Sequence, residues 1–285
     1  MRPNHLTLAA AKVIKHRVRI DGDTGPWVVF SNSLGCTLEM WDAQTAALST
    51  QYRVLRYDTR GHGGSEVTPG PYTLDMLARD LLDVLNAAEI SSCTVVGLSL
   101  GGMIAQTAVL LAPHRFDRVV LADTTSHYGA ASAKFWADRI DQALTVGLGS
   151  IAQTTPARWF TPAFAAGHPE VVERYQEMLL SANPAGYAGC CAAIAAIDAT
   201  KRLAAVTVPV CVIVGEQDPS TTIAHAERIH KATAHSTLHV IPDAAHLSNV
   251  EQPERFSSIL SDFLASMPAN FPDNPGAGKP VDRRA

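Results

Sequence analysis

The chain has 285 residues, of which 47% are hydrophobic and 18% are charged, and its formal net charge is −4. This length and composition predict a globular protein with a large buried core. The charge balance lacks the broad basic surface of nucleic-acid binding and the basic cluster of membrane-surface binding. We therefore expect no nucleic-acid partner and no membrane partner, and the oligomeric state stays open.

Five cysteines occur in the chain, and two of them are adjacent. An odd number without metal-ligand spacing suits reduced thiols better than a disulfide framework. Residues 1–20 contain only a short apolar patch, which Lys12 interrupts, so they do not predict a signal peptide. No later segment has the length of a bilayer-spanning helix. The sequence therefore favours a soluble, cytoplasmic protein.

Most of the chain alternates between strand-like and helix-like segments. Residues 16–35 predict a hairpin that turns at residues 21–26 and leads into a buried strand. Further β-branched runs predict strands within residues 52–57, 92–98, 115–122, 208–215 and 236–242. Helical spacing of apolar residues predicts helices within residues 73–90, 100–112 and 253–267, the first of which starts near Thr73 and Asp75. This alternation is typical of an α/β fold with a parallel sheet.

The segment between the fifth and sixth of these strands has a different pattern. Residues 127–205 are rich in alanine and predict several helices without a strand, which indicates a helical cap inserted over the sheet. The expected organisation is a core formed by residues 1–126 and 206–267, with the cap at 127–205 between its two parts. Residues 268–285 form a tail whose polar, Pro/Gly-rich composition is typical of disorder.

The motif GLSLG occupies residues 97–101, between a predicted buried strand and a predicted helix. In this context G-x-S-x-G is a nucleophile elbow, where glycines two positions before and after the serine avoid a steric collision. Ser99 is therefore the candidate nucleophile. The N–H of Leu100, at the helix N-terminus, is a candidate donor to an oxyanion. A glycine-rich turn with an incidental serine explains the pentapeptide alone equally well.

Two later residues strengthen the catalytic interpretation. A serine nucleophile needs a base and an acid that orients the base, and in this fold they follow the serine in the order Asp, His. Asp218 follows the strand-like run CVIVG, and His246 follows LHVIP. Each alone fits an ordinary loop residue. Together, in this order and after three strands, they favour a triad of Ser99, His246 and Asp218.

Other polar residues lie in similar positions along the chain. Asp123 also follows a strand-like run and is an alternative acid. Asp58 and His62, in the loop YDTRGHGGS, are better explained as organisers of that loop. The remaining histidines, which include His127, His225 and His230, show no metal-ligand arrangement, and we assign them no metal role.

A second oxyanion donor is expected from the loop after the first buried strand. Hydrolases with such an elbow usually have His-Gly in this loop, whereas this chain has Asn32 and Ser33, followed by Leu34. Counting back from Trp41 keeps the loop spacing, so we expect the Leu34 N–H to act together with the Leu100 N–H.

These residues and several longer motifs resemble one enzyme family. Over about residues 15–266 the chain resembles the α/β-hydrolases, through GLSLGG, YDTRGHGGS and the late Asp and His. More narrowly, it is similar to the 3-oxoadipate enol-lactonases, through SNSLG, LEMWDAQ, RWFTPAF, GYAGCCAAI and DAAHLSNVEQPE. The resemblance implies a mostly parallel eight-stranded sheet flanked by helices, with an inserted helical cap. Family members often have Asn in place of Asp123, so the choice between the two acids stays open.

The resemblance also implies the chemistry. The expected reaction is hydrolysis of a five-membered enol-lactone that bears a carboxymethyl group, in the β-ketoadipate pathway of aromatic catabolism. The substrate would be a small anionic lactone, with Ser99 as nucleophile, His246 as base and Asp218 as the orienting acid. This chemistry requires neither a metal nor an organic cofactor.

The carboxylate of such a substrate calls for a fixed cation, for which arginine is best suited. In the cap, Arg139 and Arg158 lie near the aromatic residues Trp136 and Trp159 in the sequence. Each arginine could instead be solvated or brace the cap helices. Of these residues we select Trp136 and Arg139 as candidates for substrate binding.

Two other classes of function fit the same residues. A general carboxylesterase or a C–C bond hydrolase would use the same triad, because substrate choice depends on the pocket rather than on the fold. A non-catalytic ligand receptor could also keep all three residues. A dehalogenase is disfavoured, since that chemistry requires a carboxylate at position 99.

Overall fold

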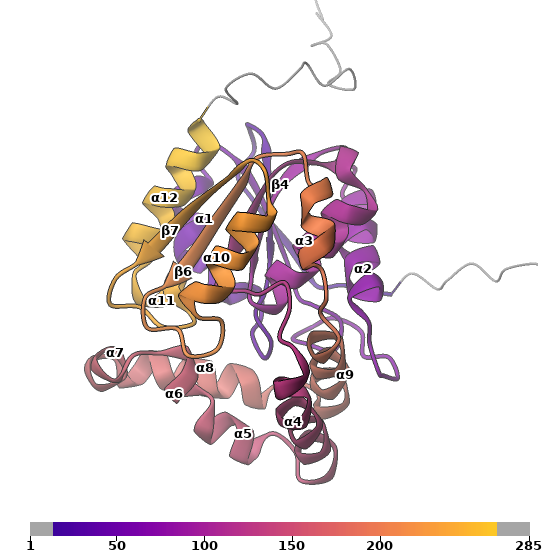
Figure 1. The fold of residues 1–285 in the computed structure, drawn as a ribbon, viewed down its shortest axis with the longest axis vertical. Helices are drawn as coiled ribbons and strands as arrows, with labels where there is room; N and C mark the ends of the chain where they lie inside the picture. Colours follow the sequence, from indigo (N-terminus) through magenta and orange to yellow (C-terminus); the bar gives the residue numbers. More distant parts are fainter. Residues whose placement is uncertain (1–13, 267–285) are drawn as a thin grey trace, which may run out of the picture.

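A seven-stranded sheet runs through the middle of the described part of the chain, residues 14–266 of a computed structural model (Figure 1). The strands are β1 Val18–Asp21, β2 Trp27–Ser31, β3 Arg53–Tyr57, β4 Cys93–Leu98, β5 Phe116–Ala122, β6 Val210–Gly215 and β7 Ser236–Ile241. Their order in the sheet is β1-β3-β2-β4-β5-β6-β7, and only the β1–β3 pair is antiparallel. The predicted α/β fold with a mostly parallel sheet is confirmed.

The central strands are buried on both faces. Every residue of β4 and every residue of β6 is buried, as expected where helices cover both sides of a parallel sheet. Because β2, β4, β5 and β6 are parallel, their carboxyl ends lie along one edge of the sheet. The loops that carry Ser99, Asp123 and Asp218 leave the sheet at this edge.

Two expectations from the sequence are wrong. Residues 16–35 do not form a hairpin, because β3 lies between β1 and β2. The turn between β1 and β2 packs on the chain before β3 instead: a Cβ at Gly22 or Gly25 would lie within 2.6 Å of backbone oxygens of residues 49–52. The sheet was expected to have eight strands, but it has seven within residues 14–266. The eighth strand rested on the family resemblance, whereas the sequence itself has seven strand-like runs in this range.

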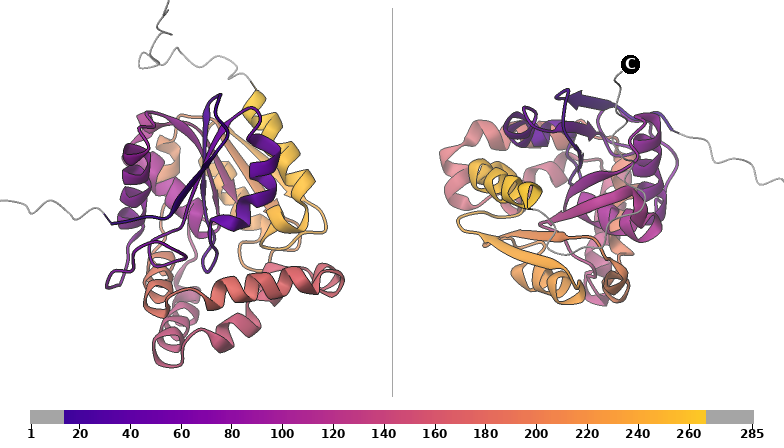
Figure 2. Two further views of the ribbon diagram at one scale, coloured as in Figure 1. Left: turned by 180° about the vertical axis from the view of Figure 1, so that it is seen from behind. Right: turned by 90° about the horizontal axis from the view of Figure 1, so that it is seen from above.

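Helices cover both faces of the sheet (Figure 2). One face carries α1 Asp42–Leu48 and α12 Pro253–Ala265, and the other carries α2 Leu74–Ala87, α3 Leu100–Leu111 and α10 Ile223–Ala232. Helix α2 begins where predicted, because the Thr73 hydroxyl accepts the Met76 N–H at 3.1 Å. Such an N-cap satisfies a donor that the helix itself leaves free.

The described chain between β5 and β6 is helical, and most of it lies across the edge where the parallel strands end (Figure 1). Its helices are α4 Ala133–Thr145, α5 Gly149–Thr154, α6 Pro156–Trp159, α7 Pro162–Gly167, α8 Pro169–Leu180 and α9 Pro184–Ala195. We call residues 127–205 the cap. Four short 3₁₀ helices and α11 Ser248–Glu251 complete residues 14–266: η1 Leu38–Trp41, η2 Pro113–Arg115, η3 Ala130–Ser132 and η4 Thr200–Ala205.

Residues 14–266 contain no single helix that is both long and apolar enough to cross a membrane, and α8 and α9 meet that criterion only as a pair bent by 96°. The predicted tail at residues 268–285 lies outside the described residues, as does the start of the core, residues 1–13.

The turn from β4 into α3 brings three backbone segments into close contact. A Cβ at Gly97 would lie 2.2 Å from the carbonyl oxygen of Gly101, and a Cβ at Gly101 would lie 2.0 Å from that of Ser31. The predicted collision therefore occurs at both glycines, but at Gly101 it would be with β2 rather than with a side chain at residue 97. Ser99, between them, has φ 57°, a conformation that is strained for a residue with a side chain.

The Gly101→Ala substitution should lower the free energy of unfolding by about 3 kcal/mol, because the new methyl group must displace backbone rather than a flexible side chain. Urea denaturation measures this loss. Gly149→Ala is the matched control, since a Cβ there would meet nothing within 4 Å beyond its chain neighbours and its own helix backbone, and it should change stability by less than about 1 kcal/mol. Equal stability of the two variants would contradict this account of the elbow.

Candidate active site

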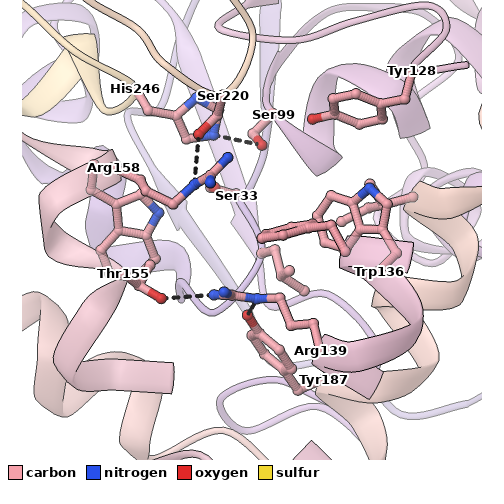
Figure 3. A pocket seen from close by; sticks show the side chains of 14 residues that line it. Ser33, Ser99, Tyr128, Trp136, Arg139, Thr155, Arg158, Tyr187, Ser220 and His246 are labelled. Atoms are coloured by element: carbon pink, nitrogen blue, oxygen red, sulfur yellow. Dashed lines mark hydrogen bonds between the residues drawn. The ribbon is translucent and has the colours of Figure 1, made fainter. Parts of the chain in front are cut away.

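Three side chains that are far apart in the sequence meet at the edge where the parallel strands end (Figure 3). The hydroxyl of Ser99 lies 2.9 Å from Nε2 of His246, and Nδ1 of the same ring lies 2.8 Å from Oδ2 of Asp218. All three residues are buried. In the neutral histidine these distances fit a proton on Nδ1 that is donated to Asp218, which leaves Nε2 free to accept the Ser99 proton. The structure therefore brings together the three residues selected from the sequence.

The carboxylate of Asp218 is held by the loop that carries it. Its Oδ1 accepts the N–H groups of Ser220 and Thr221 at 2.7 and 3.0 Å, and its Oδ2 accepts the Thr221 hydroxyl at 2.6 Å. Burial alone would raise the pKa of Asp218, but the charge of His246 and these hydrogen bonds outweigh burial and lower the pKa to about 2. Asp218 is therefore ionised at neutral pH and fixed in direction.

The imidazole of His246 responds to the same contact. Burial disfavours its charged form, but the negative charge and the hydrogen bond of Asp218 more than compensate, so its pKa lies above the ordinary value. A raised pKa makes the ring a better proton acceptor. Such a base can take a proton from Ser99 and hold the resulting charge against Asp218.

The rival acid, Asp123, faces other partners. Its Oδ1 accepts the Gly215 N–H at 2.7 Å, and its Oδ2 accepts the Ser248 hydroxyl at 2.5 Å. Burial, together with the nearby charge of Asp218, raises the pKa of Asp123 to about 8. Asp123 thus links β5 to β6 and to α11, while Asp218 is the carboxylate that contacts His246.

Two backbone N–H groups beside Ser99 lack protein acceptors within residues 14–266. One belongs to Leu100, the first residue of α3, where the helix leaves its N–H groups unpaired. The other belongs to Leu34, although both neighbouring amides are engaged: the Ser33 N–H meets Sδ of Met40 at 3.3 Å, and the Gly35 N–H is donated to His62 at 3.0 Å. Ser31 at the end of β2 pairs with Gly97 in β4, so the loop after β2, which contains Leu34, lies beside the turn that contains Ser99 and Leu100.

Asp58 and His62, in the loop YDTRGHGGS, contact the loop that follows β2, as their predicted organising role requires. Burial lowers the pKa of His62 to about 4, so the ring is neutral at neutral pH, and Nε2 accepts from Gly35 while Nδ1 faces the Arg60 carbonyl at 3.3 Å. Asp58 accepts the N–H groups of Leu38 and Gly64 at 2.8 and 2.9 Å. Both residues therefore hold the loop that presents Leu34.

A pocket opens beside Ser99 and is lined from both sides, by core residues that include Leu34 and His246 and by cap residues. The cap contributes Trp136, Arg139 and Arg158 to its wall, so both candidates for substrate binding lie in the pocket (Figure 3). Arg158, the second arginine of the cap near an aromatic residue in the sequence, lines it as well. Within residues 14–266 no group of His, Cys, Asp or Glu side chains could hold a metal ion.

Sequence reasoning missed the contacts that connect the cap to the triad loops. The buried carboxylate of Glu251 accepts the Ala245 N–H at 2.8 Å, next to His246, and the Thr161 hydroxyl at 2.8 Å from the cap. The Leu247 N–H is also donated to the Trp159 carbonyl at 3.0 Å. Glu251 and Thr161 both occur in motifs that carried the family resemblance, which was the only signal for them.

Asp218→Asn should lower kcat/KM by about 10³- to 10⁴-fold, because an amide neither stabilises the imidazolium nor selects the correct tautomer. Asp123→Asn should lower it less than about tenfold, since Asp123 does not contact His246.

In the wild type, activity should rise with pH through a midpoint above 6.5, where His246 loses its proton. Asp218→Asn should move this midpoint downwards, because it removes the charge that raises the pKa. Initial rates between pH 5 and 9 measure both effects, and the reverse order of the two variants would make Asp123 the acid.

Comparison with known proteins places these residues in a family. A family model described as the alpha/beta hydrolase fold matches residues 26–253. Two 3-oxoadipate enol-lactonases of Acinetobacter baylyi are 41% and 37% identical to the chain over 251 residues, which is 88% of this chain and 93% of each relative. These are the relatives that the sequence motifs indicated.

Solved structures agree with this result. The crystal structure of an enol-lactonase from Burkholderia xenovorans has a TM-score of 0.87 and 36% identity, and the match covers 90% of this chain and 99% of that one. A thermophilic esterase from Thermogutta terrifontis has a TM-score of 0.84 and 30% identity, with 88% and 93% of the two chains covered. The chain is therefore a hydrolase that belongs to the α/β-hydrolase fold family, in the group that includes the 3-oxoadipate enol-lactonases.

Proposed function

We propose that this enzyme hydrolyses 3-oxoadipate enol-lactone to 3-oxoadipate, as a step of aromatic-compound catabolism in the β-ketoadipate pathway. The observation that carries the proposal is the combination of groups around one pocket. A Ser–His–Asp contact lies beside two arginines, Arg139 and Arg158. Neither guanidinium has a carboxylate of residues 14–266 within 4.0 Å. This arrangement supports an ester substrate that carries its own negative charge.

Acylation follows from the contacts of His246. Its Nε2 takes the proton of Ser99 as the hydroxyl oxygen attacks the ring carbonyl, and Asp218 stabilises the imidazolium that forms. The N–H groups of Leu34 and Leu100 receive the oxyanion of the tetrahedral intermediate, where loss of one such donor commonly costs about 3 kcal/mol. The imidazolium then gives its proton to the ring oxygen, which leaves as an enol.

Deacylation uses the same groups. The enol remains tethered after ring opening, because it belongs to the same molecule as the acyl group. His246 activates a water molecule that attacks the acyl-enzyme, and Ser99 recovers its proton when the ester bond breaks. The released enol converts to the ketone, 3-oxoadipate. Every proposed step uses side chains and backbone amides of this chain.

The wild type should consume the enol-lactone much faster than p-nitrophenyl acetate, and Ser99→Ala should lower the lactone rate by at least about 10³-fold. Loss of the enol-lactone absorbance measures the first activity, and release of p-nitrophenolate measures the second. A strong preference for p-nitrophenyl acetate would replace the proposal with a general carboxylesterase, the activity suggested by the likeness to the Thermogutta terrifontis esterase.

Arg139 and Trp136 are proposed to contact the substrate from the cap. The guanidinium of Arg139 is fixed by the hydroxyls of Tyr187 and Thr155, each at 2.7 Å, so it adds both positive charge and rigidity to the pocket wall.

Arg139→Ala should raise KM for the enol-lactone by about tenfold and change kcat by less than about threefold, because binding weakens while the triad is untouched. Steady-state kinetics separates the two constants. An unchanged KM would remove Arg139 from the substrate site.

A further inference from the structure

The two pocket arginines differ in what their guanidinium groups already bind. Arg139 uses Nε and one terminal nitrogen for hydrogen bonds to Tyr187 and Thr155, both in the cap. Arg158 uses only Nε, which is donated to the Ser220 hydroxyl at 3.2 Å. Neither terminal nitrogen of Arg158 donates a hydrogen bond to any group in residues 14–266. The two terminal nitrogens of Arg158 are therefore available as parallel donors for a bidentate contact with a carboxylate.

The surroundings of Arg158 hold this pair of donors in place. Its guanidinium carbon lies 4.9 Å from the centre of the Phe135 ring, which favours a cation over the ring face. Ser220, which accepts from its Nε, also donates its own N–H to Asp218. Arg158 is thus anchored to the loop that carries the triad acid, although the arginine itself belongs to α6 of the cap.

The chemistry of the lactone, which here rests on the proposed function, decides where its carboxylate must lie. In 3-oxoadipate enol-lactone, the ring carbon that bears the carboxymethyl group is also bonded to the ring oxygen. That oxygen is the leaving group, and it must face Nε2 of His246 to receive a proton. The carboxylate is therefore held on the His246 side of the pocket.

Arg158 occupies this side. It is bound to Ser220 next to the triad, and its positive charge opposes the imidazolium of His246 and so works to lower the pKa of that ring. Arg139 instead bonds to Thr155 and to Tyr187 of α9, away from His246 (Figure 3). An anion bound at Arg158 would also offset the repulsion between the two cations while the imidazolium forms.

We propose that Arg158 is the specificity-determining residue that binds a carboxylate attached to the leaving group of the ester. Arg139 still contacts the substrate as a fixed part of the pocket wall, but its guanidinium, which is already bonded to Tyr187 and Thr155, does not pair with this carboxylate. The enzyme should therefore favour esters whose leaving group carries an anion close to the ester oxygen. An anion on the acyl side should bring no comparable advantage.

Aryl esters test this inference without the lactone. Acetylsalicylate carries a carboxylate on its leaving group, separated from the ester oxygen by the same number of bonds as in the lactone, and methyl acetylsalicylate is its neutral counterpart. Monophenyl succinate carries the anion on the acyl side, and phenyl acetate is the neutral reference. The measured quantity is the ratio of kcat/KM between the charged and the neutral ester of each pair.

In the wild type, the ratio for the acetylsalicylate pair should exceed that for the succinate pair. Arg158→Gln should lower the first ratio by about 10- to 100-fold, the usual worth of a charged hydrogen-bonded contact. Arg158→Lys, which keeps the charge but loses the paired donors, should give an intermediate ratio. Arg139→Gln should change the ratio less than about threefold. Arg174→Gln, in α8 of the cap, is the control and should match the wild type, because Arg174 pairs with Asp42 of α1 and does not line the pocket.

An unchanged ratio in Arg158→Gln, or a larger loss of the ratio in Arg139→Gln, would overturn the inference. If Arg158→Gln does not fold, Arg158→Lys serves in its place. An acetylsalicylate ratio in Arg158→Lys equal to that of the wild type would then overturn the inference. A separate measurement addresses the proposed function. A wild type that keeps the leaving-group preference but does not consume the enol-lactone would refute the lactonase activity and leave the role of Arg158 standing.

Discussion

The close approach of α3 to the end of β2 is the contact on which the site depends. Gly101 lies so near the end of β2 that a Cβ there would lie 2.0 Å from the Ser31 carbonyl oxygen, and the chain makes a strained turn at Ser99, two residues before this contact. The turn presents the Ser99 hydroxyl to the pocket, and within residues 14–266 it leaves the Leu100 N–H without a protein acceptor. Since the loop that presents Leu34 begins where β2 ends, the same contact brings both proposed oxyanion donors towards the nucleophile.

A second constraint is the number of charges that the buried edge can hold. Asp123 and Asp218 both follow central strands, and two ionised carboxylates close together in a buried site repel each other. Asp218 receives three donors from its own loop as well as His246, whereas Asp123 receives two. The charge of His246 and these hydrogen bonds lower the pKa of Asp218, whereas burial and the charge of Asp218 raise the pKa of Asp123. Of the two carboxylates, Asp218 is the one that contacts the imidazole.

The cap and the catalytic loops are parts of one site. Residues 158–161 of the cap contact both triad loops, through Ser220 on the Asp218 loop and through Leu247 and Glu251 on the His246 loop. The segment that lines the pocket therefore also braces the groups that are proposed to carry out the chemistry.

Local patterns in the sequence were enough for the element types, the elbow at Ser99 and the order of Asp218 and His246, because strand periodicity, glycine sterics and loop position act over a few residues. They were not enough for the place of β3 between β1 and β2, for the contact of His246 with Asp218 rather than with Asp123, or for the contacts of Glu251 and Arg158. Those features depend on contacts between residues that are remote along the chain. Only the register of the folded sheet and the packing of the cap on its loops set these distances.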